Sequence, residues 1–247
     1  MSEKQIKIFP TVDELNQFAA TEFVRLSHQS IAESERFTVS LSGGSTPKRL
    51  FQLLASDAFR SQIDWQKIHF FFGDERQVLP ESDESNYRMA NENLFSKVKI
   101  PARNIHRFLT EEGDSETIAI KMEDEIIDFF NIKEGEFPRF DLIFLGMGAD
   151  GHTASLFPET YALKENKRIT TENFISDFEL NRLTFTYPTI NNAKNIIFLV
   201  AGEDKAEALR EVLEGKPNLE KFPSQGIAPK DGSLLFLIDE KAAEKLS

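Results

Sequence analysis

The residues best suited to catalysis lie in a glycine-framed loop, residues 146–152, with the sequence GMGADGH. Histidine can accept a proton near neutral pH, and a neighbouring carboxylate can orient its ring and hold the proton-accepting tautomer. The surrounding glycines indicate unusual backbone angles in this loop. We therefore take His152 as a candidate general base and Asp150 as its orienting group. The alternative is that His152 is a hydrogen-bonded structural histidine.

A second loop, residues 42–47 with the sequence SGGSTP, has the features of a phosphate-binding turn. Its glycines let the backbone approach a ligand, and the helix expected after it offers free N–H groups and a partial positive charge. The alternative is a tight turn with Thr46 as helix N-cap. The loop matches neither the P-loop nor the dinucleotide fingerprint, so we expect no ATP or dinucleotide cofactor. The candidate phosphate ligands are Ser42, Gly43, Gly44, Ser45 and Thr46.

A third candidate is the charged triplet of residues 74–76, DER, which follows the apolar run FFF at residues 70–72. Arg76 is a candidate contact for an oxyanion or a hydroxyl group, held in place by a neighbouring carboxylate. Three successive charged residues are also typical of a solvated turn, so the triplet by itself does not decide between the two interpretations.

The composition excludes several classes of protein. Among 247 residues there is no cysteine, which excludes disulfides, a thiolate nucleophile and cysteine-ligated metals. No two histidines have metal-ligand spacing, so we expect no metal. Lys and Arg number 29 against 41 Asp and Glu, a net charge of −12, which argues against nucleic-acid and anionic-membrane partners. No apolar run is long enough for export or for crossing a bilayer, so we expect a cytoplasmic protein.

The elements that must position these loops alternate between apolar strands and helices. The pattern predicts strands over residues 6–9, 37–41, 68–72, 141–145, 183–186, 195–201 and 234–238. It predicts helices over about 12–31, 47–58, 86–95, 116–130, 205–213 and 240–246. We read this as one α/β domain spanning residues 1–247, with a mostly parallel, Rossmann-like sheet and helices on both faces. Residues 165–190 are expected to form an antiparallel excursion, and residues 215–232 a loop.

This topology also predicts where the candidate loops meet. In open α/β sheets, ligands bind at the carboxyl ends of the strands. Each of the three loops directly follows a predicted strand, so we expect them to converge at one edge of the sheet.

At these loops the sequence resembles the 6-phosphogluconolactonases. They belong to a fold group that includes glucosamine-6-phosphate deaminase and ribose-5-phosphate isomerase, and the resemblance implies that fold. Two details favour the lactonases over the deaminases. The deaminases typically show DEY where this chain has DER, and IAFNEP where this chain has TASLFP after residue 152. The matching blocks are residues 41–47 (LSGGSTP), 72–78 (FGDERQV), 85–87 (SNY), 145–158 (LGMGADGHTASLFP), 182–205 and 223–239.

The resemblance implies hydrolysis of 6-phospho-D-glucono-1,5-lactone to 6-phosphogluconate in the oxidative pentose phosphate pathway, without a cofactor. With no cysteine and no GxSxG motif, direct attack by water is favoured over an acyl-enzyme. His152 is then the base, Asp150 orients it or the water, and Arg76 lies near the carbonyl oxygen or the ring hydroxyls. The substrate- and phosphate-binding residues are expected to be Ser42, Gly43, Gly44, Ser45, Thr46, Asp74, Arg182 and Lys205.

Two other functions fit the same resemblance. One is an isomerase or deaminase of sugar phosphates, which release of ammonia from glucosamine 6-phosphate would reveal. The other is a non-enzymatic sugar-phosphate sensor, which would bind 6-phosphogluconate without turning over the lactone. We expect a monomer or a weak homodimer. Because the substrate is an anion and the chain is acidic, we also expect the active cleft to be a positive region on an acidic surface.

Overall fold

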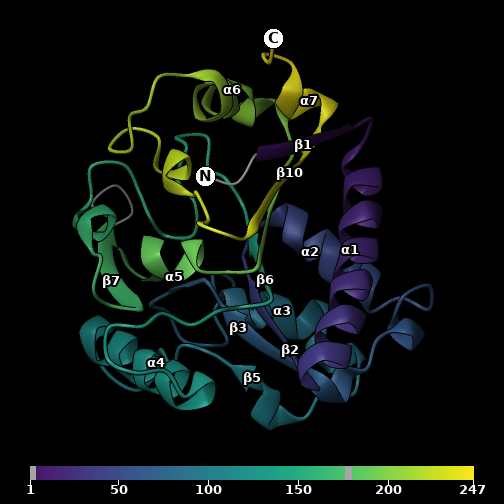
Figure 1. Ribbon diagram of the computed structural model, residues 1–247, viewed down its shortest axis with the longest axis vertical. Coiled ribbons are helices and arrows are strands. Elements are labelled where there is room, and N and C mark those ends of the chain that lie inside the picture. Colours follow the sequence, from purple (N-terminus) through teal and green to yellow (C-terminus); the bar gives the residue numbers. More distant parts are fainter. Residues whose placement is uncertain (1–3, 176–179) are drawn as a thin grey trace.

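The computed structural model describes residues 4–175 and 180–247 (Figure 1). The strands are β1 (Lys4–Phe9), β2 (Phe37–Leu41), β3 (Ile68–Phe72), β4 (Asp74–Arg76), β5 (Ile105–His106), β6 (Leu142–Leu145), β7 (Thr170–Ile175), β8 (Leu180–Phe185), β9 (Asn195–Val200) and β10 (Ser233–Asp239). The α-helices are α1 (Val12–Ser34), α2 (Ser45–Leu54), α3 (Asn86–Asn93), α4 (Ser115–Phe130), α5 (Tyr187–Asn191), α6 (Ala206–Glu214) and α7 (Glu240–Ala243).

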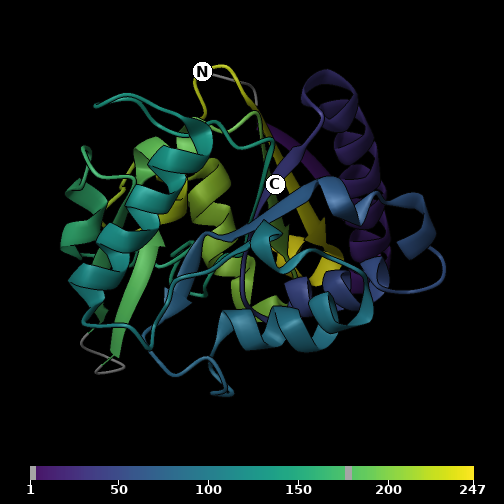
Figure 2. The same cartoon turned by 90° about the horizontal axis from the view of Figure 1, so that it is seen from below.

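Within the described residues, seven strands form one parallel sheet in the order β1-β10-β9-β6-β2-β3-β5. Figures 1 and 2 show α1 and α2 on one side of this sheet, with α4, α5 and β7 on the other. The predicted α/β fold, with a mostly parallel sheet covered by helices on both faces, is confirmed. No helix in the described part of the chain is long and apolar enough to cross a membrane.

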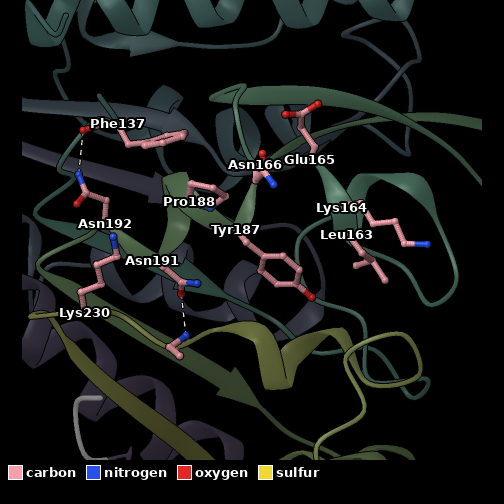
Figure 3. Close-up of a pocket in the computed structure, with 11 residues that line it drawn as sticks. Phe137, Leu163, Lys164, Glu165, Asn166, Tyr187, Pro188, Asn191, Asn192 and Lys230 are labelled. Carbon is pink, nitrogen blue, oxygen red and sulfur yellow. Dashed lines mark hydrogen bonds between the residues drawn. The ribbon is translucent and has the colours of Figure 1, made fainter. Parts of the chain in front are cut away.

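A small antiparallel sheet in the order β4-β8-β7 supplements the large one. It confirms the predicted antiparallel excursion over residues 165–190. Residues 74–76 form its edge strand β4, so of the two interpretations left open for the charged triplet, the solvated turn is excluded. Helix α5 follows β8 directly, and its residues Tyr187 and Asn191 line a pocket of about 680 Å³ (Figure 3).

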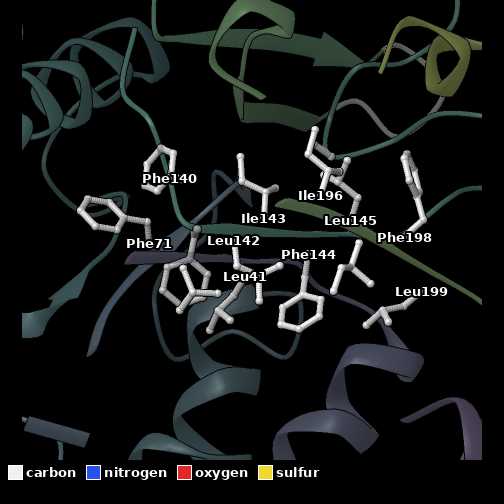
Figure 4. Packing of buried hydrophobic residues seen from close by; sticks show 14 of the residues in the cluster. Leu41, Phe71, Phe140, Leu142, Ile143, Phe144, Leu145, Ile196, Phe198 and Leu199 are labelled. Carbon is white, nitrogen blue, oxygen red and sulfur yellow. The ribbon is translucent and has the colours of Figure 1, made fainter. Parts of the chain in front are cut away.

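The core explains why the central strands read as unbroken apolar runs. Successive side chains of a strand point to opposite faces of the sheet. In β6, Ile143 and Leu145 lie on one face and Leu142 and Phe144 on the other, and all four are buried (Figure 4). A strand covered on both faces needs apolar residues at every position.

Two helix starts test the local predictions. The helix predicted from about residue 12 begins at Val12, and Thr11 caps it, with its hydroxyl accepting a hydrogen bond from the Glu14 N–H at 3.2 Å. The predicted start at Pro47 is wrong, because α2 begins at Ser45 and Gly44 is its N-cap with φ 103°. The third helical position still tolerates proline, because the N–H groups of the first turn have no partner within the helix.

A histidine pair lies at the β3–β5 edge, where His106 is buried and His69 is half-buried. Nδ1 of His69 lies 3.1 Å from Nε2 of His106, whose Nδ1 lies 2.6 Å from a Glu125 carboxylate oxygen. Burial lowers the pKa of His69 from 6.5 to about 4, and the charges of His106, Arg36 and Arg103 add to this effect. The parallel pairing of β5 with β3 brings the two histidines together, and nothing in their local sequence indicates it.

The depressed pKa of His69 predicts a dependence of stability on pH. Between pH 6.5 and 4 the unfolded chain binds a proton at this residue that the folded chain refuses, so its contribution to stability falls as the pH falls. His69→Gln should remove this contribution. The free energy of unfolding in urea, measured at pH 7.5, 6 and 5, should then decline less steeply than in the wild type. The exposed His28 gives the control His28→Gln, which should follow the wild type; parallel curves for all three proteins would contradict the prediction.

Candidate active site

The three candidate loops converge on one pocket, as the topology predicts. They follow β2, β3 and β6, which are neighbours in the large sheet. The pocket has a volume of about 190 Å³. It is lined by Ser42, Gly43, Gly44, Asp74, Arg76, Asn86, Gly146, Met147, Gly148, His152, Ala154, Arg182 and Lys205.

Most of the predicted site residues line this pocket, and three do not. Asp150 stands behind His152 and reaches the pocket only through its hydrogen bond to that ring. Ser45 and Thr46 form the first turn of α2, where Thr46 is buried and Ser45 lines a separate groove beside α1. Their roles as phosphate ligands stay predictions.

His152 and Asp150 form a close pair. Nδ1 of His152 lies 2.6 Å from Oδ1 of Asp150, which also accepts the His152 backbone N–H at 3.1 Å. Burial by itself would raise the pKa of Asp150, but the hydrogen bond and the charge of His152 outweigh burial and lower it. With Nδ1 engaged by a carboxylate, the tautomer that leaves Nε2 free as a proton acceptor is favoured. The ring stacks on Phe157 with centroids 4.0 Å apart.

The glycines allow this loop to close on itself. The Gly148 N–H donates to the His152 carbonyl at 2.9 Å, and the Gly151 N–H donates to the Gly148 carbonyl at 3.0 Å. A Cβ at Gly148 would lie 2.1 Å from Nδ1 of His152 and 2.4 Å from Oδ1 of Asp150. Position 148 therefore requires glycine, because any side chain would separate the pair.

Two arginines stand side by side in the same pocket, and Arg182 lies over the Phe157 ring on which His152 stacks. Arg76 of β4 pairs in register with Arg182 of β8, so both side chains lie on the same face of the small sheet. Burial lowers the pKa of Arg182, and the charge of Arg76 lowers it further. Arg76 donates from Nη1 to the Glu84 carbonyl at 2.6 Å, while its buried Nε has no partner among the described residues. Like charges so close favour an anion between them.

A buried hydrogen-bond network fixes the backbone around Arg76. It includes Asn86, which was not among the site residues predicted from the sequence. The Glu75 carboxylate accepts the N–H groups of Arg76, Asn86 and Tyr87, each at 2.8 Å, and burial raises its pKa. Asn86 donates from Nδ2 to the Asp74 carbonyl at 3.0 Å. The only sequence signal for Asn86 was its place in the SNY block of the resemblance.

The same network brings the glycine loop against the wall. A Cβ at Gly43 would lie 2.0 Å from Oδ1 of Asn86, so only glycine lets the chain pass here. Asp74, which was predicted to bind substrate, is buried and accepts the Ser155 hydroxyl at 2.8 Å through Oδ2. Its Oδ1 accepts a hydrogen bond from Nδ2 of Asn86 at 3.3 Å, so both carboxylate oxygens have partners within the protein.

The cations of the pocket outnumber its anions. Arg76, Arg182 and Lys205 line it, together with one carboxylate, Asp74. Lys205 ends the short helix η7 (Glu203–Lys205) after β9, and its Nζ lies 2.9 Å from a carboxylate oxygen of Asp204. The local balance is positive although the chain carries −12 overall. Among residues 4–175 and 180–247, no group of three or more His, Cys, Asp or Glu is placed to share a metal ion.

The pocket is polar and lies at the carboxyl edge of a parallel sheet. This is the place where open α/β proteins bind small ligands, so fold and pocket put the chain in that class. Residues 10–236 match the family model described as glucosamine-6-phosphate isomerases/6-phosphogluconolactonase. The chain belongs to this family, and the resemblance predicted from its loops is confirmed.

Relatives and solved structures agree with this assignment. The 6-phosphogluconolactonase of Synechocystis is 44% identical over 218 residues, which are 88% of each chain. That of Haemophilus influenzae is 37% identical, covering 96% of this chain and 98% of its own. The structure of 6-phosphogluconolactonase from Trypanosoma cruzi superposes with a TM-score of 0.89 at 30% identity, covering 100% of this chain and 98% of its own. A monomeric glucosamine-6-phosphate deaminase, at 22% identity and a TM-score of 0.82, shares the fold.

Proposed function

We propose that the protein hydrolyses 6-phospho-D-glucono-1,5-lactone to 6-phosphogluconate in the oxidative pentose phosphate pathway. The names of its relatives support this activity. The observation that carries the proposal is the arrangement of the pocket, in which the His152–Asp150 pair and the Arg76–Arg182 pair line the same cavity. This arrangement combines a base for water with cations for a developing oxyanion.

The chemistry proceeds by direct attack of water. Nε2 of His152 takes a proton from water, and the water oxygen bonds to the lactone carbonyl carbon. Arg76 stabilises the negative charge that forms on the carbonyl oxygen. When the tetrahedral intermediate collapses, the bond to the ring oxygen breaks, and that oxygen takes the proton back from His152. Asp150 orients the imidazole and stabilises its charged form.

The phosphate end of the substrate lies on the glycine loop. Gly43 and Gly44 line the pocket at the start of α2, where N–H groups have no partner within the helix. Lys205 adds a positive charge, Ser42 a hydroxyl, and Arg182 is a second cation for the same anion. The reaction needs no cofactor, and we propose a monomeric or weakly dimeric cytoplasmic enzyme.

A coupled assay tests the function. Glucose-6-phosphate dehydrogenase generates the lactone, and 6-phosphogluconate formation is followed with and without the protein, after subtraction of spontaneous hydrolysis. Faster formation is expected. Ammonia release from glucosamine 6-phosphate would favour the deaminase function, and binding of 6-phosphogluconate without turnover would favour the sensor; either result without lactone turnover overturns the proposal.

A further inference from the structure

The segment of residues 222–228 contacts the back of the histidine loop, and the proposed mechanism leaves it without a role. It contains the short helix η8 (Pro223–Gly226). Both the N–H and the hydroxyl of Ser224 donate to the Gly151 carbonyl, at 2.9 and 2.8 Å. Ser224 is 1% exposed, so these bonds are shielded from water. They act on the residue that lies between Asp150 and His152 in the chain.

Helix α5 holds η8 from its other side. The Tyr187 hydroxyl donates to the Pro223 carbonyl at 2.7 Å. Asn191 donates to the Gly226 carbonyl at 2.9 Å and accepts the Ala228 N–H at 2.7 Å. In Figure 3 the side chains of Tyr187 and Asn191 extend toward the yellow-green segment that contains η8. Burial raises the pKa of Tyr187, so its hydroxyl stays protonated and able to donate.

These contacts connect the loop of His152 with the strand that carries Arg182. Helix α5 follows β8, the strand that carries Arg182 in register with Arg76. The hydrogen bonds within the histidine loop define its internal shape, whereas the Ser224 bonds tie it to η8 and so to α5. Ser155, three residues after His152, also ties the loop directly to β4 and β8, because its hydroxyl donates to Asp74 at 2.8 Å and its N–H to the Thr184 hydroxyl at 3.2 Å. The η8 contacts are a second tether, and they act on the Asp150–His152 part of the loop.

We propose that Tyr187 and Ser224 are positioning residues that act through η8 to hold His152 at its working distance from the arginines. This inference rests on the proposed lactonase function. Neither side chain is among those lining the candidate pocket, so both act through Gly151 and not on the substrate. Displacing a reacting group by about 1 Å can cost on the order of 100-fold in rate.

The test compares Tyr187→Phe and Ser224→Ala with Tyr161→Phe. Tyr161 is a matched control, because its hydroxyl also donates to a backbone carbonyl, that of Glu172, away from η8. The first two variants should lower kcat about 10- to 100-fold and leave KM within about twofold, because only the base is displaced. Tyr161→Phe should keep both values. Unchanged kcat in both test variants would overturn the inference, as would a loss shared by the control.

A second readout does not depend on activity. The NMR signals of the His152 ring, assigned with His152→Gln, should shift in Tyr187→Phe and Ser224→Ala but stay in place in Tyr161→Phe. If the wild type does not hydrolyse the lactone, the proposed function fails while this shift still tests the positioning role. If only one of the two variants folds, that variant decides the question. Undisturbed ring signals in a folded variant would overturn the inference.

Discussion

Replacing His152 with alanine should lower kcat/KM for the lactone by roughly 10²–10⁴-fold, the usual contribution of a general base. The ring is the only imidazole among the residues that line the pocket, and its Nδ1 is engaged by Asp150 at 2.6 Å. Without it, water must lose its proton to solvent during the attack. KM should change little, because His152 is not among the residues proposed to bind the phosphate. The coupled lactone assay measures the effect.

The control for this variant is His28→Ala, which removes an exposed histidine from α1 and should leave turnover unchanged. Asp150→Asn should lose activity less completely than His152→Ala, because the ring stays while its orientation and charge stabilisation are weakened. A folded His152→Ala protein that hydrolyses the lactone at the wild-type rate would refute the assignment of the base.

Replacing Arg76 with methionine should lower kcat by roughly 10²–10³-fold, the typical cost of losing one donor to a developing oxyanion. Its Nε is buried without a partner among the described residues, as expected for a group that waits for a ligand. Methionine keeps most of the side-chain length but supplies neither charge nor hydrogen bonds. The neighbouring Arg182 should retain part of the substrate affinity, so KM should rise less than kcat falls.

A variant at Arg88 tests whether Arg76 acts on the oxyanion or only orders its loop. It donates to the Glu81 carbonyl at 2.7 Å, much as Arg76 donates to the Glu84 carbonyl, so both arginines order the same loop. Arg88 does not line the pocket. Arg88→Met should therefore keep the wild-type kcat in the coupled assay. Equal losses in Arg76→Met and Arg88→Met would show that loop order, and not charge at the oxyanion, is responsible.

The charge of the chain illustrates how little a global sum says about a site. The net charge of −12 is spread over the surface, and salt screens it beyond about 8 Å under physiological conditions. Inside the pocket, three cations face one carboxylate. A phosphorylated substrate responds to this local arrangement, which a sum over the whole chain does not reveal.

The sequence by itself determined which loops meet. Each apolar run marked a strand, each strand of a parallel sheet ends at the same edge, and the glycine and histidine patterns directly followed those ends. These relations are local, because they depend on residue types within one segment and on a topological rule. The family followed from the same short blocks, and so did the expectation that His152 and Asp150 act as a pair.

Only the tertiary structure decided how those loops are held. The register of β4 with β8 puts Arg76 beside Arg182, and Ser224 reaches Gly151 across 73 residues of chain. The meeting of His69 and His106 likewise depends on strand pairing. Such contacts depend on the register and packing of distant segments. A shift of one residue in the pairing of β4 with β8, for example, would place their side chains on opposite faces of the sheet. No spacing within a single segment encodes that information, so it appears only once the chain is folded.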